Sequence, residues 1–279
     1  MRIGICVSVE DIGAAERAGY EYVELTVTNI CPEIGKAEID TLKRRLRKTA
    51  IKPEAWRRFI PTELRLVGED VSFTRITRFV RIVLGRAAEL GGEVVVFGSP
   101  GCRNIPDGFP RDKAHQQLIA FLQMTADVAA ESNITVVIEP ITRKNCNVLN
   151  LVSEAIALAQ EVDRPEIRVL ADLFHMTANN EPPDAIAKAG KCLHHIHMPV
   201  PIVAGLSEPR AITTRLPAYP MSEFLEELRG INYTHRVSVE DLDRRFMNLE
   251  REAPLVFSYL KATWEKLSTR SATESGEDC

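Results

Sequence analysis

The chain has 279 residues, 45% of them hydrophobic and 27% charged, and a formal net charge of −4. A globular chain of this length buries a core large enough to fold without disulfides, as one large domain or two small ones. The negative charge argues against a broad nucleic-acid surface, and no apolar run approaches the length of a membrane span. The six cysteines are scattered without a CxxC motif, which favours reduced thiols in a cytoplasmic protein.

The first half of the chain alternates short apolar, β-branched runs with segments of helical periodicity. Apolar residues recur at three- and four-residue steps in the helical segments, and a Gly-Gly pair marks the turn into the clearest strand. Strands are predicted at residues 2–7, 21–27, 52–59 and 91–99, and helices at 9–19, 36–49, 71–90 and 113–131.

The second half continues this alternation with the strand-like runs ITVVIEP, IRVLADLFH, LHHIHMP and HRVSVED, and with helices predicted near 152–161, 183–190, 221–229 and 250–267. Eight βα units favour an α/β fold in which a parallel eight-stranded sheet closes into a (β/α)₈ TIM barrel. An open doubly wound sheet is the rival, but the chain has neither GxGxxG after its first strand nor a P-loop. We expect residues 1–268 to form the barrel and the small, polar residues 269–279 to form a disordered C-terminal tail.

Each strand of the second half ends on a residue that can bind a metal ion: Glu139, Asp172, His197 and Glu240. The C-terminal ends of barrel strands meet at one site, and the alternation of side chains along each strand is compatible with all four pointing inward. Singly, each has an ordinary explanation, such as a helix N-cap for the aspartate or a packed core histidine. Together, three carboxylates and one imidazole predict an open divalent-metal site.

The strings IEPITRKNCNVLN, ADLFHM, HIHM and SVED resemble motifs of the xylose isomerase-like TIM barrels, in particular the sugar phosphate isomerases and epimerases of the ketose 3-epimerase and hydroxypyruvate isomerase branch. The resemblance implies one divalent ion, Mn²⁺ first and Mg²⁺ or Co²⁺ as alternatives, on the four strand-end residues. It also implies that Glu139 and Glu240 act as the acid/base pair and that His175 donates a hydrogen bond to a substrate oxygen. The implied activity is isomerisation or epimerisation of a carbohydrate through a cis-enediolate.

The chain departs from this family pattern at two positions. Ketose epimerases of this kind carry a second Glu at the position of Asn145 and an Arg at the position of Val203. We therefore expect weak recognition of free ketohexoses, and a substrate that is larger, differently charged or differently oxidised. Asn145 stays a predicted substrate contact.

Other residues on or near strand ends are candidates for the missing contacts. Arg143, Arg57, Arg58 and Trp56 are candidate substrate contacts, although salt-bridged surface positions for the arginines and a place in the barrel wall for Trp56 explain them equally well. His195 has inward parity one layer below His197, where it could bind substrate or support the metal ligand. Glu24 is also compatible with an inward position, either beside the ligands or in an ion pair of the barrel.

Alternatives remain open at this stage. A lyase acting on a keto-sugar or keto-cyclitol would share the first proton abstraction, and a DNA-repair enzyme of the endonuclease IV type or an inactive binding barrel is disfavoured by the few histidines and the intact ligand set. The expected partner is a small carbohydrate or keto-sugar, with no nucleic acid and no membrane, and the protein could be a homo-oligomer. The long connections 100–111 and 199–220 are candidate lids or substrate contacts.

Overall fold

Eight parallel strands close into a barrel in the computed structural model, which describes residues 1–206, 219–242 and 246–274. The strands are β1 (Arg2–Cys6), β2 (Tyr22–Thr26), β3 (Pro53–Arg57), β4 (Val94–Phe97), β5 (Thr135–Ile138), β6 (Ile167–Asp172), β7 (Leu193–Pro199) and β8 (Arg236–Glu240). They follow one another around the ring in chain order, and β1 pairs with β8 to close it. The predicted (β/α)₈ barrel is confirmed.

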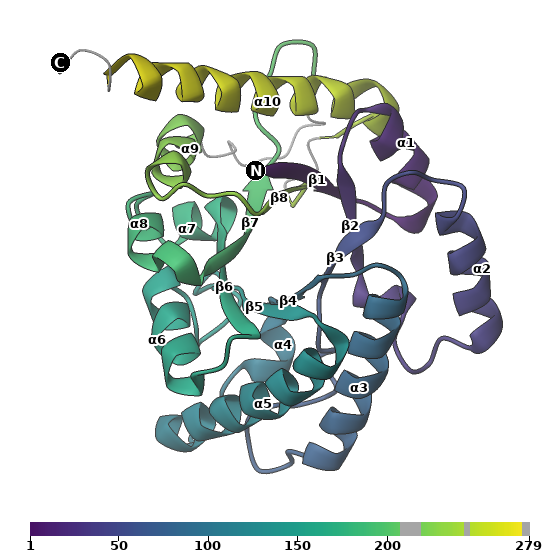
Figure 1. The fold of residues 1–279 in the computed structure, drawn as a ribbon. Helices are drawn as coiled ribbons and strands as arrows, with labels where there is room; N and C mark the ends of the chain where they lie inside the picture. Colours follow the sequence, from purple (N-terminus) through teal and green to yellow (C-terminus); the bar gives the residue numbers. More distant parts are fainter. Residues whose placement is uncertain (207–218, 243–245, 275–279) are drawn as a thin grey trace.

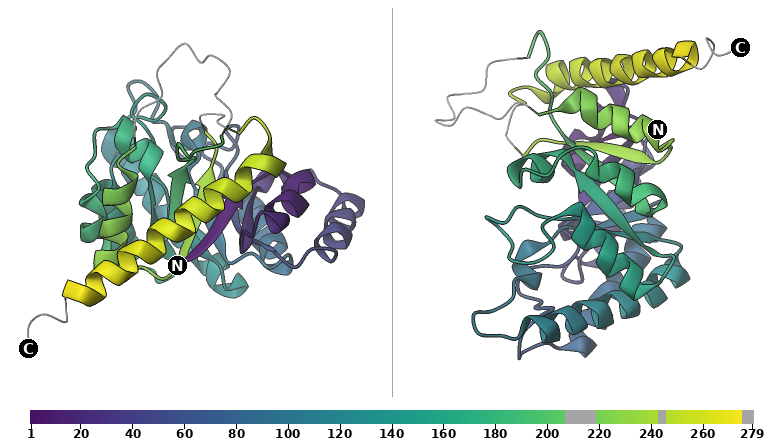
Figure 2. Two further views of the ribbon diagram at one scale, coloured as in Figure 1. Left: turned by 90° about the horizontal axis from the view of Figure 1, so that it is seen from above. Right: turned by 90° about the vertical axis from the view of Figure 1, so that its left-hand side faces the viewer.

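Helices surround the strands on the outside, as Figure 1 shows in a view along the barrel. The α-helices are α1 (Ile12–Arg17), α2 (Lys36–Leu46), α3 (Phe73–Glu89), α4 (Pro100–Arg103), α5 (Arg111–Ser132), α6 (Val152–Val162), α7 (Leu173–Ala178), α8 (Ala185–Ala189), α9 (Met221–Gly230) and α10 (Leu249–Glu274). Short 3₁₀ turns lie at Val9–Asp11, Val27–Asn29 and Gly190–Cys192. The long α10 packs against α1 and α9, across the side of the barrel where the sheet closes (Figure 2).

Two apolar cores follow from the alternation of side chains along the strands. The larger core lies between the sheet and the helices. The smaller one fills the inside of the barrel and consists of Tyr22, Ala55, Val94, Val96, Val137 and Leu170. Tyr22 occupies the space over Gly4, where an added Cβ would lie 2.3 Å from the tyrosine ring, and its hydroxyl lies 2.9 Å from Ser238 Oγ. This cluster occupies the barrel interior, and the cavity described below lies at the C-terminal ends of the strands.

A cluster of ion pairs lies at the opposite, N-terminal end of the barrel. Glu54 Oε2 lies 2.6 Å from both Arg2 Nη1 and Arg236 Nη2, and Arg236 also pairs with Glu93. The guanidinium groups of Arg2 and Arg236 both face the Tyr22 ring at 5.9 Å. This ion cluster stabilises the N-terminal end of the barrel and lies far from the predicted metal ligands along the strands.

The structure differs from the expected elements in three places. The connection predicted at 100–111 contains the short helix α4, and α7, which begins directly after β6, was not predicted. Helix α10 ends at Glu274, past the predicted barrel end at residue 268, because Ala and Glu in the small polar segment are also good helix formers. Residues 275–279 of the predicted tail, and 207–218 of the long connection after β7, lie outside the described residues. Among the residues that are described, no helix is long and apolar enough to cross a membrane.

Candidate metal centre

The four predicted ligands converge on one point at the C-terminal end of the barrel. Asp172 and Glu240 are the last residues of β6 and β8, His197 lies near the end of β7, and Glu139 follows β5 directly. All four side chains are buried, and one donor atom from each lies within 4.8 Å of the others. The convergence follows from the inward parity that the sequence suggested.

His197 lies between the carboxylates. Its Nδ1 is 2.9 Å from Glu139 Oε1 and 3.0 Å from Glu240 Oε2, while its Nε2 is 2.9 Å from Glu24 Oε1. Burial by itself would lower the pKa of His197, but the charges of Glu24, Glu240 and Glu139 outweigh it and raise the pKa well above the usual value. When Nε2–H donates to Glu24, Nδ1 is left to face the carboxylates, which is the orientation a metal-binding imidazole needs.

Asp172 has one carboxylate oxygen without a hydrogen bond. Its Oδ1 accepts the backbone N–H of Phe174 at 2.7 Å and so caps α7, but its buried Oδ2 has no hydrogen-bond partner. Burial and the neighbouring charges of Glu139 and Glu240 raise the pKa of Asp172 well above its ordinary value. A buried, unpartnered carboxylate oxygen beside two further carboxylates is costly unless a cation compensates it. Three carboxylates and one imidazole are a donor set that fits a divalent ion such as Mn²⁺, Mg²⁺ or Co²⁺.

Glu240 has a second cationic neighbour, Arg57, at the end of β3. Arg57 Nη1 lies 2.5 Å from Glu240 Oε1. Burial would raise the pKa of Glu240, but His197 and Arg57 outweigh it and hold the pKa below the usual value. Glu240 is therefore ionised at neutral pH, which suits both a ligand and a proton acceptor.

Gly98, just after β4, makes room for Glu139. A Cβ at Gly98 would lie 1.5 Å from Glu139 Oε2, so only glycine leaves space for this carboxylate. Strand β4 contributes no donor atom, and its role in the site is to let the β5 carboxylate lie close to its backbone.

Glu24 and His195 form a layer beneath the four ligands. Glu24 is fully buried, and its Oε2 lies 2.9 Å from His195 Nε2, while its Oε1 contacts His197. His195 is also 3.3 Å from Ser238 Oγ. Burial would raise the pKa of Glu24, but His197 and His195 hold it well below its ordinary value. A single carboxylate thus orients both imidazoles of the HxH motif.

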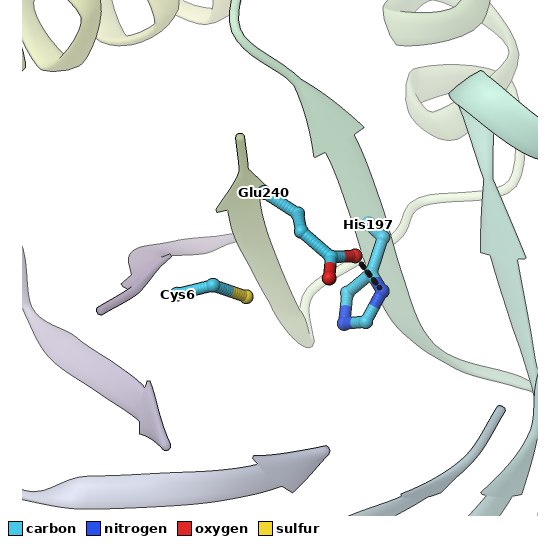
Figure 3. A group of neighbouring side chains, drawn as sticks. All are labelled: Cys6, His197 and Glu240. Carbon is cyan, nitrogen blue, oxygen red and sulfur yellow. Dashed lines mark ion pairs between the residues drawn. The ribbon is translucent and has the colours of Figure 1, made fainter. Parts of the chain in front are cut away.

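Cys6 approaches the same centre from the end of β1. Figure 3 shows its side chain on the side of Glu240 away from the barrel wall formed by β7, and its Sγ belongs to a group of close donor atoms with His197 and Glu240. Burial and the charge of Glu24 raise the pKa of Cys6 well above the usual value, so the thiol stays neutral. A neutral thiol is a weak ligand beside carboxylates.

A cavity of about 1040 Å³ opens above the centre. Glu139, His197 and Glu240 line it, and so do His175 and Asn145, two of the candidate substrate contacts. This volume lies at the upper end of small-molecule sites.

Three predicted substrate contacts do not line this cavity. Trp56 is fully buried in the layer between sheet and helices, because Arg57 takes the inward position on β3 and its neighbour must face outward. His195 is fully buried beneath Glu24, and Arg143 is exposed on the surface, where its backbone N–H donates to Asn179 Oδ1 at 2.9 Å. Of these three, His195 keeps the supporting role that its parity suggested.

The number of candidate donor groups bears on the DNA-repair alternative, which the few histidines of the sequence disfavoured. Every group of candidate donors found among the described residues includes His197, so the groups describe one centre. His194 and His235 face each other at 4.2 Å between ring centroids, and His115 pairs with Glu161 on the surface. None of these three histidines belongs to a candidate donor group in the described part of the chain.

A family model described as xylose isomerase-like TIM barrel matches residues 12–263. The chain belongs to this family. The resemblance drawn from the strand-end motifs is therefore confirmed.

Individual relatives point to epimerases. A D-psicose 3-epimerase from Agrobacterium fabrum is 27% identical over 232 residues, which cover 80% of this chain and 75% of the relative. A solved L-ribulose 3-epimerase superposes with a TM-score of 0.82 at 16% identity and covers 100% of this chain and 99% of its own. A structure of the IolI protein with a bound zinc atom has a TM-score of 0.69 at 18% identity, covering 98% and 99%. The structural matches confirm the barrel fold.

Proposed function

We propose that this protein is a divalent-metal-dependent carbohydrate isomerase or epimerase that removes a proton from the carbon next to a carbonyl. The observation that carries the proposal is the pair Glu139 and Glu240, which come from β5 and β8, line the same cavity and flank His197 Nδ1 at 2.9 and 3.0 Å. Two carboxylates on either side of one point can take a proton from one face of a carbon and return a proton to the other.

When bound, a divalent ion supplies a positive charge that polarises the substrate carbonyl and stabilises the negative charge of the cis-enediolate. The residues of the chain do the rest. Glu139 or Glu240 accepts the proton from carbon, and the opposite carboxylate donates one back. Return to the same carbon from the other face gives epimerisation, and return to the neighbouring carbon gives isomerisation.

His175 is suited to hold a substrate oxygen. It lines the cavity, and its buried Nδ1 has no hydrogen-bond partner. Burial lowers the pKa of His175 below its usual value, so the ring is neutral and can donate a hydrogen bond without adding charge. Its Nε2 lies 3.7 Å from Asp172 Oδ2, beyond hydrogen-bonding distance, so the single proton of the neutral ring can reside on Nδ1, the nitrogen without a partner, and be donated from there.

The relatives support this assignment. The named epimerases act, by their names, on D-psicose and L-ribulose, and the IolI structure contains zinc at a site in the same fold. We propose Mn²⁺ as the ion, with Mg²⁺ or Co²⁺ as alternatives, because the donors are mostly carboxylate oxygens. The same first step could also lead to β-elimination, which would make the enzyme a lyase.

A deuterium-exchange experiment tests the proposal. Protein loaded with Mn²⁺ is incubated in D₂O with a panel of ketoses and keto-sugars, and NMR follows deuterium at the carbon next to the carbonyl and any eliminated product. We expect wash-in that disappears with chelator, and a loss of about 10²–10⁴-fold in Glu139→Gln and Glu240→Gln.

Metal content measured on the same preparations is the control. A Gln variant that retains the metal but exchanges deuterium at the wild-type rate shows that its carboxylate is only a ligand. Exchange at full rate in chelated wild type, or no exchange with any member of the panel, overturns the proposal. Asp172→Asn, which removes a predicted ligand that lines no part of the cavity, should lose metal and exchange together.

A further inference from the structure

Three arginines line the cavity away from the metal centre. Arg58 follows β3, and Arg75 and Arg78 lie one turn apart on the same face of α3. We refer to Arg58, Arg75 and Arg78 as the rim arginines. All three are exposed at the cavity and therefore reach the space that a substrate would occupy.

The side chains of the rim arginines have no ion pair and no hydrogen bond within the described residues. Arg57, directly before Arg58, pairs with Glu240, and Arg81, one turn after Arg78, pairs with Glu131 at 3.0 Å. The guanidinium groups at the cavity thus have no protein partner among the described residues, whereas the neighbouring Arg57 and Arg81 have one. A guanidinium presents several donors in a fixed fork that matches a carboxylate or a phosphate.

Arg58 is held in a backbone conformation that arginine rarely adopts. Its φ is 59°, in the left-handed region, while the next residue, Phe59, is fully buried and its N–H donates to Val96 O at 3.3 Å. Successive side chains of a strand normally point to opposite sides, yet Arg57 and Arg58 both line the cavity. The left-handed residue makes this possible, and such strain is concentrated at functional sites.

The charge balance at the cavity mouth favours an anion. Glu33 and Glu63 are the two acidic residues that line it apart from the metal centre, so three arginines face two glutamates. Asn145, at the position where the resemblance led us to expect a glutamate, lines the cavity without a charge. The cavity lining therefore offers an anionic group three guanidinium groups and no carboxylate at residue 145.

We infer that the substrate carries an anionic group, a carboxylate or a phosphate, at the end remote from the carbon that loses its proton, and that the rim arginines bind this group. The inference rests on the proposed function, since it specifies the substrate class of the same site. It explains why a cavity with an epimerase-like centre would have unpaired arginines at its other end.

The test compares substrates and variants in the Mn²⁺-loaded protein. Deuterium exchange is measured on a neutral ketopentose, on the same sugar with a 5-phosphate and on a keto-aldonate, so that the last two distinguish phosphate from carboxylate. We expect kcat/KM for one anionic substrate to exceed that for the neutral sugar by about 10²-fold or more, as several charge-assisted hydrogen bonds allow. The double variant Arg75→Gln/Arg78→Gln should lose about 10–100-fold, mainly through KM.

Two further variants separate recognition from structure. Arg81→Gln, on the same helix but outside the cavity, should keep the wild-type preference. Arg58→Gly relieves the left-handed strain, so it should fold with an unchanged or higher Tm while losing preference for the anionic substrate. A preference that survives both Arg58→Gly and the double variant overturns the inference.

The inference and the proposed function fail in different ways. Equal exchange on neutral and anionic sugars overturns the inference and leaves the proposed function intact. If no sugar exchanges, the proposed function fails, and titration calorimetry with inorganic phosphate decides the inference separately. Binding that is at least about 10-fold weaker in the double variant than in Arg81→Gln supports the rim arginines as an anion site. Absence of binding, or binding that is equal in both variants, overturns it.

Discussion

The two halves of the barrel contribute differently to the centre. Strands β5–β8 supply all four predicted metal ligands, whereas β1–β4 supply the groups that orient, charge and make room for them. Glu24 of β2 holds His197, Arg57 of β3 pairs with Glu240, and Gly98 after β4 leaves space for Glu139. The predicted metal ligands thus come from the second half of the barrel, but their positions depend on contacts with residues of the first half.

The largest effect is expected from a substitution in the first half of the barrel, at Gly98, which is not itself a predicted metal ligand. In Gly98→Ala the new methyl group would lie 1.5 Å from Glu139 Oε2, so the carboxylate must move. Displacement of a catalytic group by about 1 Å can cost about 10²-fold in rate, and we expect a loss of that order in deuterium exchange.

Gly85→Ala is the matched control for this substitution. Gly85 lies exposed in α3, and nothing stands within 4 Å of the Cβ that would be added. Because alanine is the better helix former, this variant should keep its exchange rate and gain about 0.5–1 kcal/mol in the free energy of unfolding. Wild-type exchange in Gly98→Ala would show that the first half does not constrain Glu139.

The second test removes the carboxylate that orients His197. Glu24→Gln replaces an acceptor shared by His197 Nε2 and His195 Nε2, both at 2.9 Å, with an amide that can accept only at one end. Loss of such a partner of a metal-binding histidine typically lowers metal affinity by about 10–100-fold, and we expect this for Mn²⁺ measured by titration with a competing chelator.

Glu54→Gln is the control for Glu24→Gln. Glu54 is a buried carboxylate of the adjacent strand, but it belongs to the ion cluster at the opposite end of the barrel. The Glu54→Gln variant should have a lower free energy of unfolding and an unchanged Mn²⁺ affinity. Equal losses of affinity in the two variants would mean that Glu24 acts through general stability, and the proposed division between the halves would have to be abandoned for β2.

The metal ligands of the second half can be predicted from the sequence more easily than their partners in the first half, for a physical reason. A ligand at a strand end has a local signature, an apolar run that closes on a carboxylate or imidazole, and parity gives its direction. The partners of these ligands are far away in the chain: Glu24 is 171 residues from His195 and 173 from His197. No local pattern distinguishes Glu24 from an ordinary barrel ion pair, and Gly98 has no side chain to reveal its role.

Trp56 shows the same limit of local sequence patterns. Trp56 was a candidate contact because it lies near a strand end, but parity along β3 assigns the inward position to Arg57 and sends Trp56 to the helices. The order of the strands and most helix positions followed from periodicity, which is local. The grouping of the rim arginines has no local signature, because α3 and the end of β3 meet around one cavity only in the folded chain.

The smallest effect is expected for His194, which lies on β7 next to the inward-facing His195. His194 points away from the centre and lies against His235, with 4.2 Å between ring centroids. Burial and the neighbouring His235 lower the pKa of His194 to about 3. In the unfolded chain a histidine has a pKa of about 6.5, so below that pH the unfolded state binds a proton that the folded state does not. The contribution of His194 therefore destabilises the fold progressively as the pH falls from about 6.5 towards about 3.

His194→Gln should remove this contribution. Urea unfolding at a series of pH values should show a shallower loss of stability in acid than in wild type, by up to about one proton in the slope, and unchanged Mn²⁺ affinity at neutral pH. His235, whose pKa is lowered by its own burial and by Arg236, remains in the variant and keeps part of the acid sensitivity. An identical slope would show that His194 titrates alike in both states, and a fall in Mn²⁺ affinity would show that the outward face of β7 also supports the centre.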